Sequence, residues 1–282
     1  MHTVTIGSTP VPAIGQGTWR LGGDPEQFAA ETEALRYGLE RGLTLLDTAE
    51  MYAGGGAERV VAAALGDSRQ KAFIVSKVWP SHADPEALRT SLAASRARLQ
   101  TEVIDLYLLH WPNRTVPLRD TLWALAEARE HGAIRYLGVS NFSRDLLQAA
   151  HSILGPGLIA ANQIDYSLLE RRAEHSIIPY CRDHGIAVMA YSPLKHLGTL
   201  DLQGPGWQAL RTVSRRHLLS PHGIALAWLI GQPGIIAIPK AVTRQHIDVN
   251  RAAGDLVLTP DDRELLASAF PRAPGEMPVQ YF

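Results

Sequence analysis

The sequence predicts an α/β fold of the (β/α)8 barrel type, on three observations. Short apolar runs of strand length recur eight times, helical segments separate them, and a glycine follows several of these helices just before the next run. Runs that are apolar throughout, rather than alternating, are typical of strands buried on both faces of a parallel sheet. Eight strand–helix units in one chain favour a closed barrel over an open sheet. The runs lie at residues 14–18, 43–46, 72–76, 104–109, 136–139, 159–161, 187–190 and 235–238.

The remaining elements follow in chain order. Two runs at 4–6 and 11–13 are separated by Gly7-Ser8-Thr9-Pro10 and predict a hairpin at the base of the barrel. Asp84-Pro85 predicts a helix start, because Asp caps helices and proline suits the first turn. Glycines 42, 132 and 185 are expected to end three helices. Helices are expected at 27–41, 57–65, 85–99, 118–131, 144–152, 171–184 and 243–252, with extra helices at 207–218 and 221–230 between the seventh and eighth strands, a last one after Thr259-Pro260, and a loop at 271–282.

Composition limits the classes of function. The length of 282 residues suits one (β/α)8 barrel, so we expect residues 1–282 to form a single domain. A net charge of −1 gives no basic field that would attract nucleic acid or an anionic membrane. One cysteine, Cys181, excludes an intramolecular disulfide, and no histidine or carboxylate spacing indicates a metal site. No segment reads as a signal peptide or a membrane span, so we expect a cytoplasmic protein, with a monomer favoured.

Polar residues stand where the predicted strands end. In such barrels the active site is built at the carboxyl ends of the strands, so these side chains are expected to converge on one mouth. The basic residues are 23 arginines and only four lysines, and two of the lysines, Lys77 and Lys240, are among these strand ends. In order, the strand-end residues are Asp47, Lys77, His110, Ser140-Asn141, Gln163, Tyr191-Ser192 and Lys240.

Four residues near this mouth form a chemical set. Tyr52 follows Asp47 by five residues in the same loop, and its phenol has an ordinary pKa near 10. A lysine cation beside a phenol lowers the pKa of the phenol, and a carboxylate keeps that lysine charged and oriented. A histidine, here His110, can hydrogen-bond the same substrate oxygen. Together with Lys77 these groups predict an acid and an oxyanion site for a carbonyl that becomes an alkoxide, which is carbonyl reduction once a hydride source is present.

Seven motifs resemble the aldo-keto reductases, in order and correctly spaced over about residues 15–250. Within that family the chain is most similar to bacterial reductases of the methylglyoxal and 2,5-diketogluconate type. The resemblance implies that Tyr52 is the general acid, tuned by Lys77 and Asp47, and that His110 places the carbonyl. The motifs are Asp47-Thr48-Ala49-Glu50-Met51-Tyr52, Ser76-Lys77, Leu108-Leu109-His110-Trp111-Pro112, Gly138-Val139-Ser140-Asn141-Phe142, Asn162-Gln163, Ala190-Tyr191-Ser192-Pro193-Leu194 and Ile238-Pro239-Lys240.

The resemblance also implies NADPH as the cofactor. Ser140, Asn141 and Gln163 would hold the nicotinamide carboxamide, with Tyr191 stacked on the ring. Ser192 and Leu194 would follow the pyrophosphate, Lys240 would meet the 2′-phosphate and Asn250 the adenine, with Thr18 a further cofactor contact. The chain departs from the family pattern at Ala241 and His246, where NADPH-specific members carry serine and arginine. Arg244 is a candidate substitute for that arginine, and NADH use stays open.

Four large side chains adjoin the predicted mouth and predict an apolar substrate wall, namely Trp19, Met51, Trp79 and Trp111. The resemblance favours a small aldehyde, ketone or α-dicarbonyl as substrate. Two alternatives stay open, a Schiff-base aldolase that uses Lys77 and a nicotinamide-binding sensor with little turnover. The presence of all four tetrad residues argues against the sensor. Gly15-Gln16-Gly17 lacks the third glycine of a dinucleotide fingerprint, and Gly54-Gly55-Gly56 is read as a loop.

Overall fold

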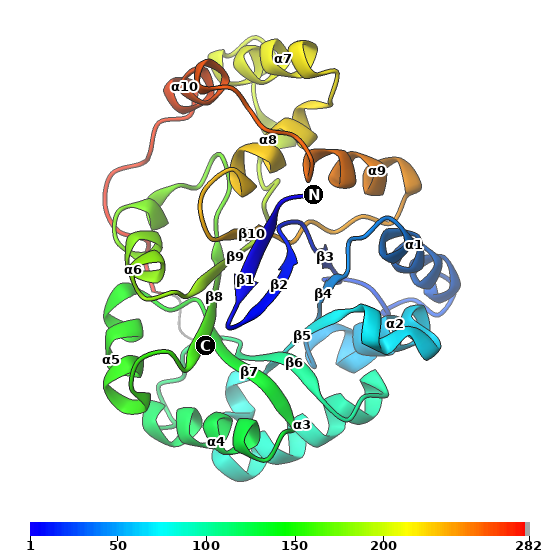
Figure 1. Ribbon diagram of the computed structural model, residues 1–282, viewed down its shortest axis with the longest axis vertical. Helices are drawn as coiled ribbons and strands as arrows, with labels where there is room; N and C mark the ends of the chain where they lie inside the picture. Colours follow the sequence, from blue (N-terminus) through cyan, green and yellow to red (C-terminus); the bar gives the residue numbers. More distant parts are fainter. Residues whose placement is uncertain (280–282) are drawn as a thin grey trace.

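Eight parallel strands pair in chain order around a central barrel in this computed structural model, which describes residues 1–279. A parallel bridge joins Ile14, just before the first strand, to Ala237 of the last strand, and the Gly17 amide donates to the Pro239 carbonyl at 3.0 Å. The ring is therefore closed, which confirms the predicted (β/α)8 barrel (Figure 1). Its strands are β3 (Gln16–Gly17), β4 (Leu45–Asp47), β5 (Phe73–Val78), β6 (Ile104–Leu109), β7 (Ile134–Ser140), β8 (Ile159–Asp165), β9 (Ala187–Tyr191) and β10 (Ile235–Ala237).

The predicted hairpin crosses one end of the barrel (Figure 1). Its antiparallel strands are β1 (Thr3–Ile6) and β2 (Thr9–Pro12), and the turn between them contains Gly7 at φ +59°. Ile6 and Val11 are buried in one apolar cluster with barrel residues such as Leu45 and Phe73. Burying these side chains closes the base, so the opposite, carboxyl end of the strands is left for a site.

Helices surround the barrel, as the apolar periodicity predicts (Figure 1). The Asp84 side chain caps its helix by accepting from the Ala87 amide at 3.1 Å, and Thr259 forms a capping box with Asp262. The three glycines predicted as helix ends, 42, 132 and 185, all have positive φ. The helices are α1 (Phe28–Glu40), α2 (Gly56–Leu65), α3 (Pro85–Leu99), α4 (Leu118–Glu130), α5 (Arg144–Leu154), α6 (Ile177–Asp183), α7 (Pro205–His217), α8 (Pro221–Ile230), α9 (Arg244–Ala253) and α10 (Pro260–Ala269).

One predicted helix is shorter than expected. Instead of a helix over 171–184, the chain forms a 3₁₀ turn at Arg172–Glu174, and α6 begins only at Ile177. Pro179 explains the break, because its ring would clash with the carbonyl of His175 four residues earlier in a continuous helix. The predicted loop at 271–282 is irregular over 271–279, and its last three residues lie outside the described part of the chain. No helix within residues 1–279 is long and apolar enough to cross a membrane.

Candidate active site

A cavity of about 290 Å³ opens at the carboxyl ends of the strands. Most of the strand-end residues that the sequence predicts do converge on it, although they come from six different strands or the loops after them. Gly17, Pro193 and Ile238 also line it, and sequence reasoning had not selected them. The other lining residues are Thr18, Trp19, Asp47, Tyr52, His110, Trp111, Ser140, Asn141, Gln163, Tyr191, Ser192 and Lys240.

Lys77 lies at the centre of the tetrad and is fully buried. Its ammonium donates to Asp47 Oδ1 at 2.7 Å, to the Thr48 carbonyl at 2.8 Å and to the Tyr52 hydroxyl oxygen at 3.4 Å. Adjacent strands β4 and β5 bring Asp47 and Lys77 together, because both residues stand near the same end of the sheet. Since the Tyr52 oxygen accepts a hydrogen bond from Lys77, the phenol proton is not used in that contact and can be donated to another group.

The second oxygen of Asp47 is held from the far side of the barrel. Gln163 Nε2 of β8 donates to Asp47 Oδ2 at 2.7 Å, and both side chains are buried. The family resemblance implies only a cofactor contact for Gln163 and does not predict this bond to Asp47. Among residues 1–279 no side chain or amide donates to Gln163 Oε1, so that oxygen is the atom this amide still offers to a ligand in the cavity. Thr18 Oγ1 donates to the Asp47 carbonyl at 2.9 Å and fixes the same loop.

Burial dominates the titration of Tyr52. It raises the pKa of the phenol well above its usual value of 10, and the Asp47 carboxylate raises that pKa further. The sequence-based expectation of a lowered pKa is therefore wrong for the chain by itself, because it left out burial and the direct effect of the Asp47 carboxylate on the phenol. Burial also lowers the pKa of Lys77, which the contact with Asp47 opposes. Tyr52 is consequently a protonated phenol at neutral pH.

His110 is a neutral imidazole. Burial and the nearby Lys77 charge lower its pKa to about 2. Its ring meets Tyr52 edge-on, with centroids 5.7 Å apart, and stacks on Trp111 at 4.2 Å. His110 Nδ1 is buried and has no hydrogen-bond partner among residues 1–279. A proton on Nδ1 would be an unpaired buried donor, so the favoured tautomer carries its proton on Nε2.

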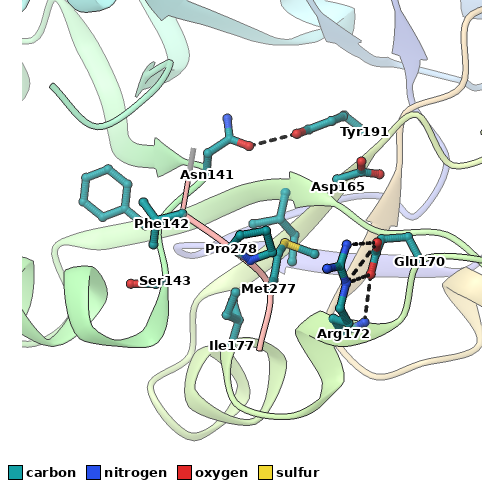
Figure 2. Close-up of a pocket in the computed structure, with 12 residues that line it drawn as sticks. Asn141, Phe142, Ser143, Asp165, Glu170, Arg172, Ile177, Tyr191, Met277 and Pro278 are labelled. Atoms are coloured by element: carbon teal, nitrogen blue, oxygen red, sulfur yellow. Dashed lines mark hydrogen bonds and ion pairs between the residues drawn. The ribbon is translucent and has the colours of Figure 1, made fainter. Parts of the chain in front are cut away.

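Hydrogen bonds order a polar wall beside the tetrad. Asn141, at φ +62°, donates from Nδ2 to the His110 carbonyl at 3.1 Å and accepts at Oδ1 from the Tyr191 hydroxyl at 2.9 Å (Figure 2). Ser140 Oγ donates to the Gln163 carbonyl at 2.9 Å. Asn141 and Tyr191 also line a second cavity of about 40 Å³, which Met277 and Pro278 of the C-terminal segment help to enclose (Figure 2). The polar wall thus presents a fixed aromatic ring and side-chain amides.

The residues predicted to contact the phosphates and the adenine of the cofactor lie at the edge of the main cavity or outside it. Lys240 is exposed at the edge of the main cavity. Arg244 is 70% exposed, forms an ion pair with Glu33 at 3.3 Å and lies over the Tyr37 ring at 4.8 Å. Asn250 is buried in α9 and Leu194 is half-buried in the loop after β9. None of Arg244, Asn250 and Leu194 lines the cavity, whereas Ser192 and Lys240 do.

Only two of the four residues predicted to form the apolar substrate wall line the cavity. Trp19, half-exposed, meets the Tyr52 ring edge-on at 4.9 Å, and both Trp19 and Trp111 line the cavity. Met51 and Trp79 do not line it. The Trp79 ring meets the His110 ring edge-on with centroids 5.6 Å apart, and the Trp79 backbone amide donates to Glu50 Oε1 at 2.6 Å. Sequence reasoning missed this role of Glu50, although its position between Asp47 and Tyr52 was a signal for it.

The fold and this cluster define an oxidoreductase built on a (β/α)8 barrel. Residues 13–269 match the Aldo/keto reductase family, and the chain belongs to that family, which confirms the resemblance. It is 40% identical to methylglyoxal reductase YeaE of Escherichia coli (strain K12) over 270 residues, which are 96% of this chain and 95% of that protein. An aldo/keto reductase from Klebsiella pneumoniae in complex with NADP and acetate superposes with a TM-score of 0.91 at 38% identity, covering 99% of each chain. A putative 2,5-diketo-D-gluconic acid reductase B superposes with a TM-score of 0.85 at 28% identity, covering 99% of this chain and 94% of that one.

Proposed function

We propose that this protein is one catalytic domain that reduces small aldehydes, ketones or α-dicarbonyls to alcohols with NADPH, and that Tyr52 is the general acid. One observation carries the proposal: a buried, protonated phenol lies at the cavity wall between the Lys77–Asp47 ion pair and a neutral imidazole. The similarity to methylglyoxal reductase YeaE supports an α-dicarbonyl as a substrate. The test is NADPH oxidation with methylglyoxal, glyoxal and 4-nitrobenzaldehyde, where no turnover with any of the three would overturn the proposal.

The residues around the cavity fit a nicotinamide dinucleotide. Side-chain amides and hydroxyls of Ser140, Asn141 and Gln163 suit a carboxamide, Tyr191 offers a ring for stacking, and Lys240 offers a cation for a phosphate. The neighbouring structure from Klebsiella pneumoniae, which holds NADP, supports the same choice. When bound, NADPH supplies a hydride for the carbonyl carbon.

Each tetrad residue has a task in proton transfer. The substrate oxygen sits between Tyr52 and His110, where His110 Nε2–H donates a hydrogen bond and Tyr52 donates its proton as the alkoxide forms. The Lys77 ammonium stabilises the phenolate that remains, since it already donates to that oxygen. Asp47 holds Lys77, and Trp19 and Trp111 exclude water from one side of the cavity.

The burial of Lys77 disfavours the Schiff-base alternative. An amine nucleophile must be neutral and accessible, whereas Lys77 Nζ is fully buried and donates to Asp47 and to the Thr48 carbonyl. A carbonyl substrate in the cavity therefore meets Tyr52 and His110 first.

The low pKa of His110 predicts a flat acid limb. A group with a pKa of about 2 stays neutral throughout the working range, so kcat/KM should show no histidine ionisation between about pH 5 and 8. His110→Gln keeps a donor at this position and should lower kcat without adding a titration. A wild-type acid limb near pH 6.5 that disappears in His110→Gln would contradict the neutral assignment.

Lys240 is expected to set the preference for NADPH over NADH. Its exposed ammonium at the cavity edge suits a 2′-phosphate, so Lys240→Ala should raise the KM for NADPH about 10-fold and leave the KM for NADH unchanged. Arg244→Ala is the comparison, with a smaller effect because Glu33 and Tyr37 already engage that guanidinium. Equal wild-type kcat/KM values for the two dinucleotides would contradict the role of Lys240.

A further inference from the structure

A buried ion pair lies against the outer side of strand β5, behind Lys77. Glu58 of α2 is fully buried. Its Oε2 accepts from Arg98 Nε of α3 at 2.6 Å, and its Oε1 accepts from Ser76 Oγ at 2.6 Å. Arg98 is 22% exposed, whereas the Glu58 side chain has no exposed surface, so water reaches only the arginine side of the pair. None of the tasks assigned to the tetrad uses this pair.

The position of Ser76 connects the pair to the active site. Successive side chains of a strand point to opposite faces, so Ser76 faces the helices while the next residue, Lys77, faces the barrel interior. Glu58 therefore holds β5 from outside, one residue before Lys77. Arg98 also packs against the loop that carries Tyr52. A Cβ atom on Gly55 of that loop would lie only 2.4 Å from Arg98 Cδ, so no larger residue fits there.

Charged and titratable groups surround Lys77 from several elements. Asp47 approaches from β4, Tyr52 from the following loop and His110 from the end of β6. Burial lowers the pKa of Lys77, whereas the Asp47 and Glu58 carboxylates both act to raise it. In a dry interior a carboxylate acts over a longer range than in water, because little solvent screens it.

We propose that Glu58 is a positioning residue that acts through Lys77: its carboxylate fixes the end of β5 through Ser76, and its charge helps to keep the Lys77 side chain an ammonium ion. The inference rests on the proposed function for the role of Lys77. It adds a residue to the electrostatics of the tetrad that touches neither substrate nor cofactor.

The scarcity of lysine makes a direct test possible. With ¹³C-lysine labelling, four lysines give four sets of side-chain signals, and Lys71, Lys195 and Lys240 serve as internal references. The ¹³Cε shift of Lys77 is followed against pH in the enzyme without cofactor or substrate. Glu58→Gln keeps the shape and the hydrogen bonds but removes the charge, so the pKa of Lys77 should fall by about 0.5–1 pH unit. A neutral Lys77 would no longer stabilise the phenolate of Tyr52, so we also expect kcat to fall at a lower alkaline pH in Glu58→Gln than in wild type.

Two variants separate charge from general damage. Ser76→Ala removes the hydrogen bond and keeps the charge, so it should shift the pKa of Lys77 less than Glu58→Gln does. Asp105→Asn is the matched control, because Asp105 is also buried, paired with Arg69 at 2.7 Å and Arg135 at 3.2 Å, and bonded to a β5 amide. It should lower the midpoint of thermal unfolding without moving the Lys77 signal.

The double variant Glu58→Gln with Arg98→Met covers the case in which Glu58→Gln does not fold, because it leaves neither member of the buried pair unpaired. Arg98 is partly exposed, so water screens its charge more than that of Glu58, and loss of both charges should still lower the pKa of Lys77. The proposal is overturned if Lys77 titrates within about 0.2 pH units of wild type in the charge variants, or if Asp105→Asn shifts it equally. Because the titration needs no turnover, an inactive wild-type enzyme would count against the proposed function and leave this result readable.

Discussion

Tyr52→Phe is expected to lower kcat by about 10²–10⁴-fold while the Kd for NADPH stays within about twofold of wild type. The variant removes the phenol proton of Tyr52, which both burial and Asp47 keep in place at the cavity wall. It keeps the ring that meets Trp19 edge-on at 4.9 Å, so the shape of the pocket is preserved. Single-turnover kinetics with methylglyoxal measure the chemical step, and fluorescence titration measures NADPH binding.

A matched control is available on the outer face of the barrel. Tyr180 of α6 donates or accepts a hydrogen bond with His151 at 2.8 Å, away from the cavity residues. Tyr180→Phe removes the same hydroxyl group and should leave kcat and the Kd for NADPH unchanged. Wild-type turnover in Tyr52→Phe would refute the role of Tyr52 as acid.

Lys77→Met is expected to reduce both turnover and stability. It leaves the buried Asp47 carboxylate with Gln163 as its remaining side-chain donor, and removal of one partner of a buried ion pair costs about 3–5 kcal/mol of unfolding free energy. Without the ammonium, the phenolate left after proton transfer also loses its stabilising charge, so kcat should fall about 10²-fold or more. Urea unfolding and steady-state kinetics measure the two effects.

The double variant Lys77→Met with Asp47→Leu separates them. Replacing both charges by apolar side chains removes the unpaired carboxylate, so stability should recover toward wild type. Turnover should not recover, because the acid site still lacks its cation. A single variant Lys77→Met with wild-type unfolding free energy would show that the ion pair does not hold Asp47 as described.

The convergence of the site is predictable from sequence because barrel geometry enforces it. Asp47, Lys77 and His110 end neighbouring strands, and parallel strands of a closed barrel bring such ends to one mouth. The Gln163–Asp47 bond joins residues 116 positions apart across the barrel, and no local pattern encodes it.

The pKa values of the site are not predictable from the sequence, for a different reason. The direction of the Tyr52 pKa depends on how completely the phenol is buried, which a list of neighbouring charges does not give. The same holds for Glu58, whose importance comes from its contact with Ser76 rather than from a motif. The break before α6 was readable, since Pro179 stands in the sequence and excludes a continuous helix.

The most direct test of the proposed chemistry is the fate of a labelled hydride. Methylglyoxal is incubated with the enzyme and NADPH deuterated at the transferable position, and the product is examined by NMR. We expect one deuterium on the new carbinol carbon for each NADPH oxidised, and transfer of the label about 10²–10⁴-fold more slowly when Tyr52→Phe replaces the wild type. Consumption of methylglyoxal without deuterium in the product, together with a borohydride-trapped adduct on Lys77, would contradict the reductase and establish the Schiff-base alternative.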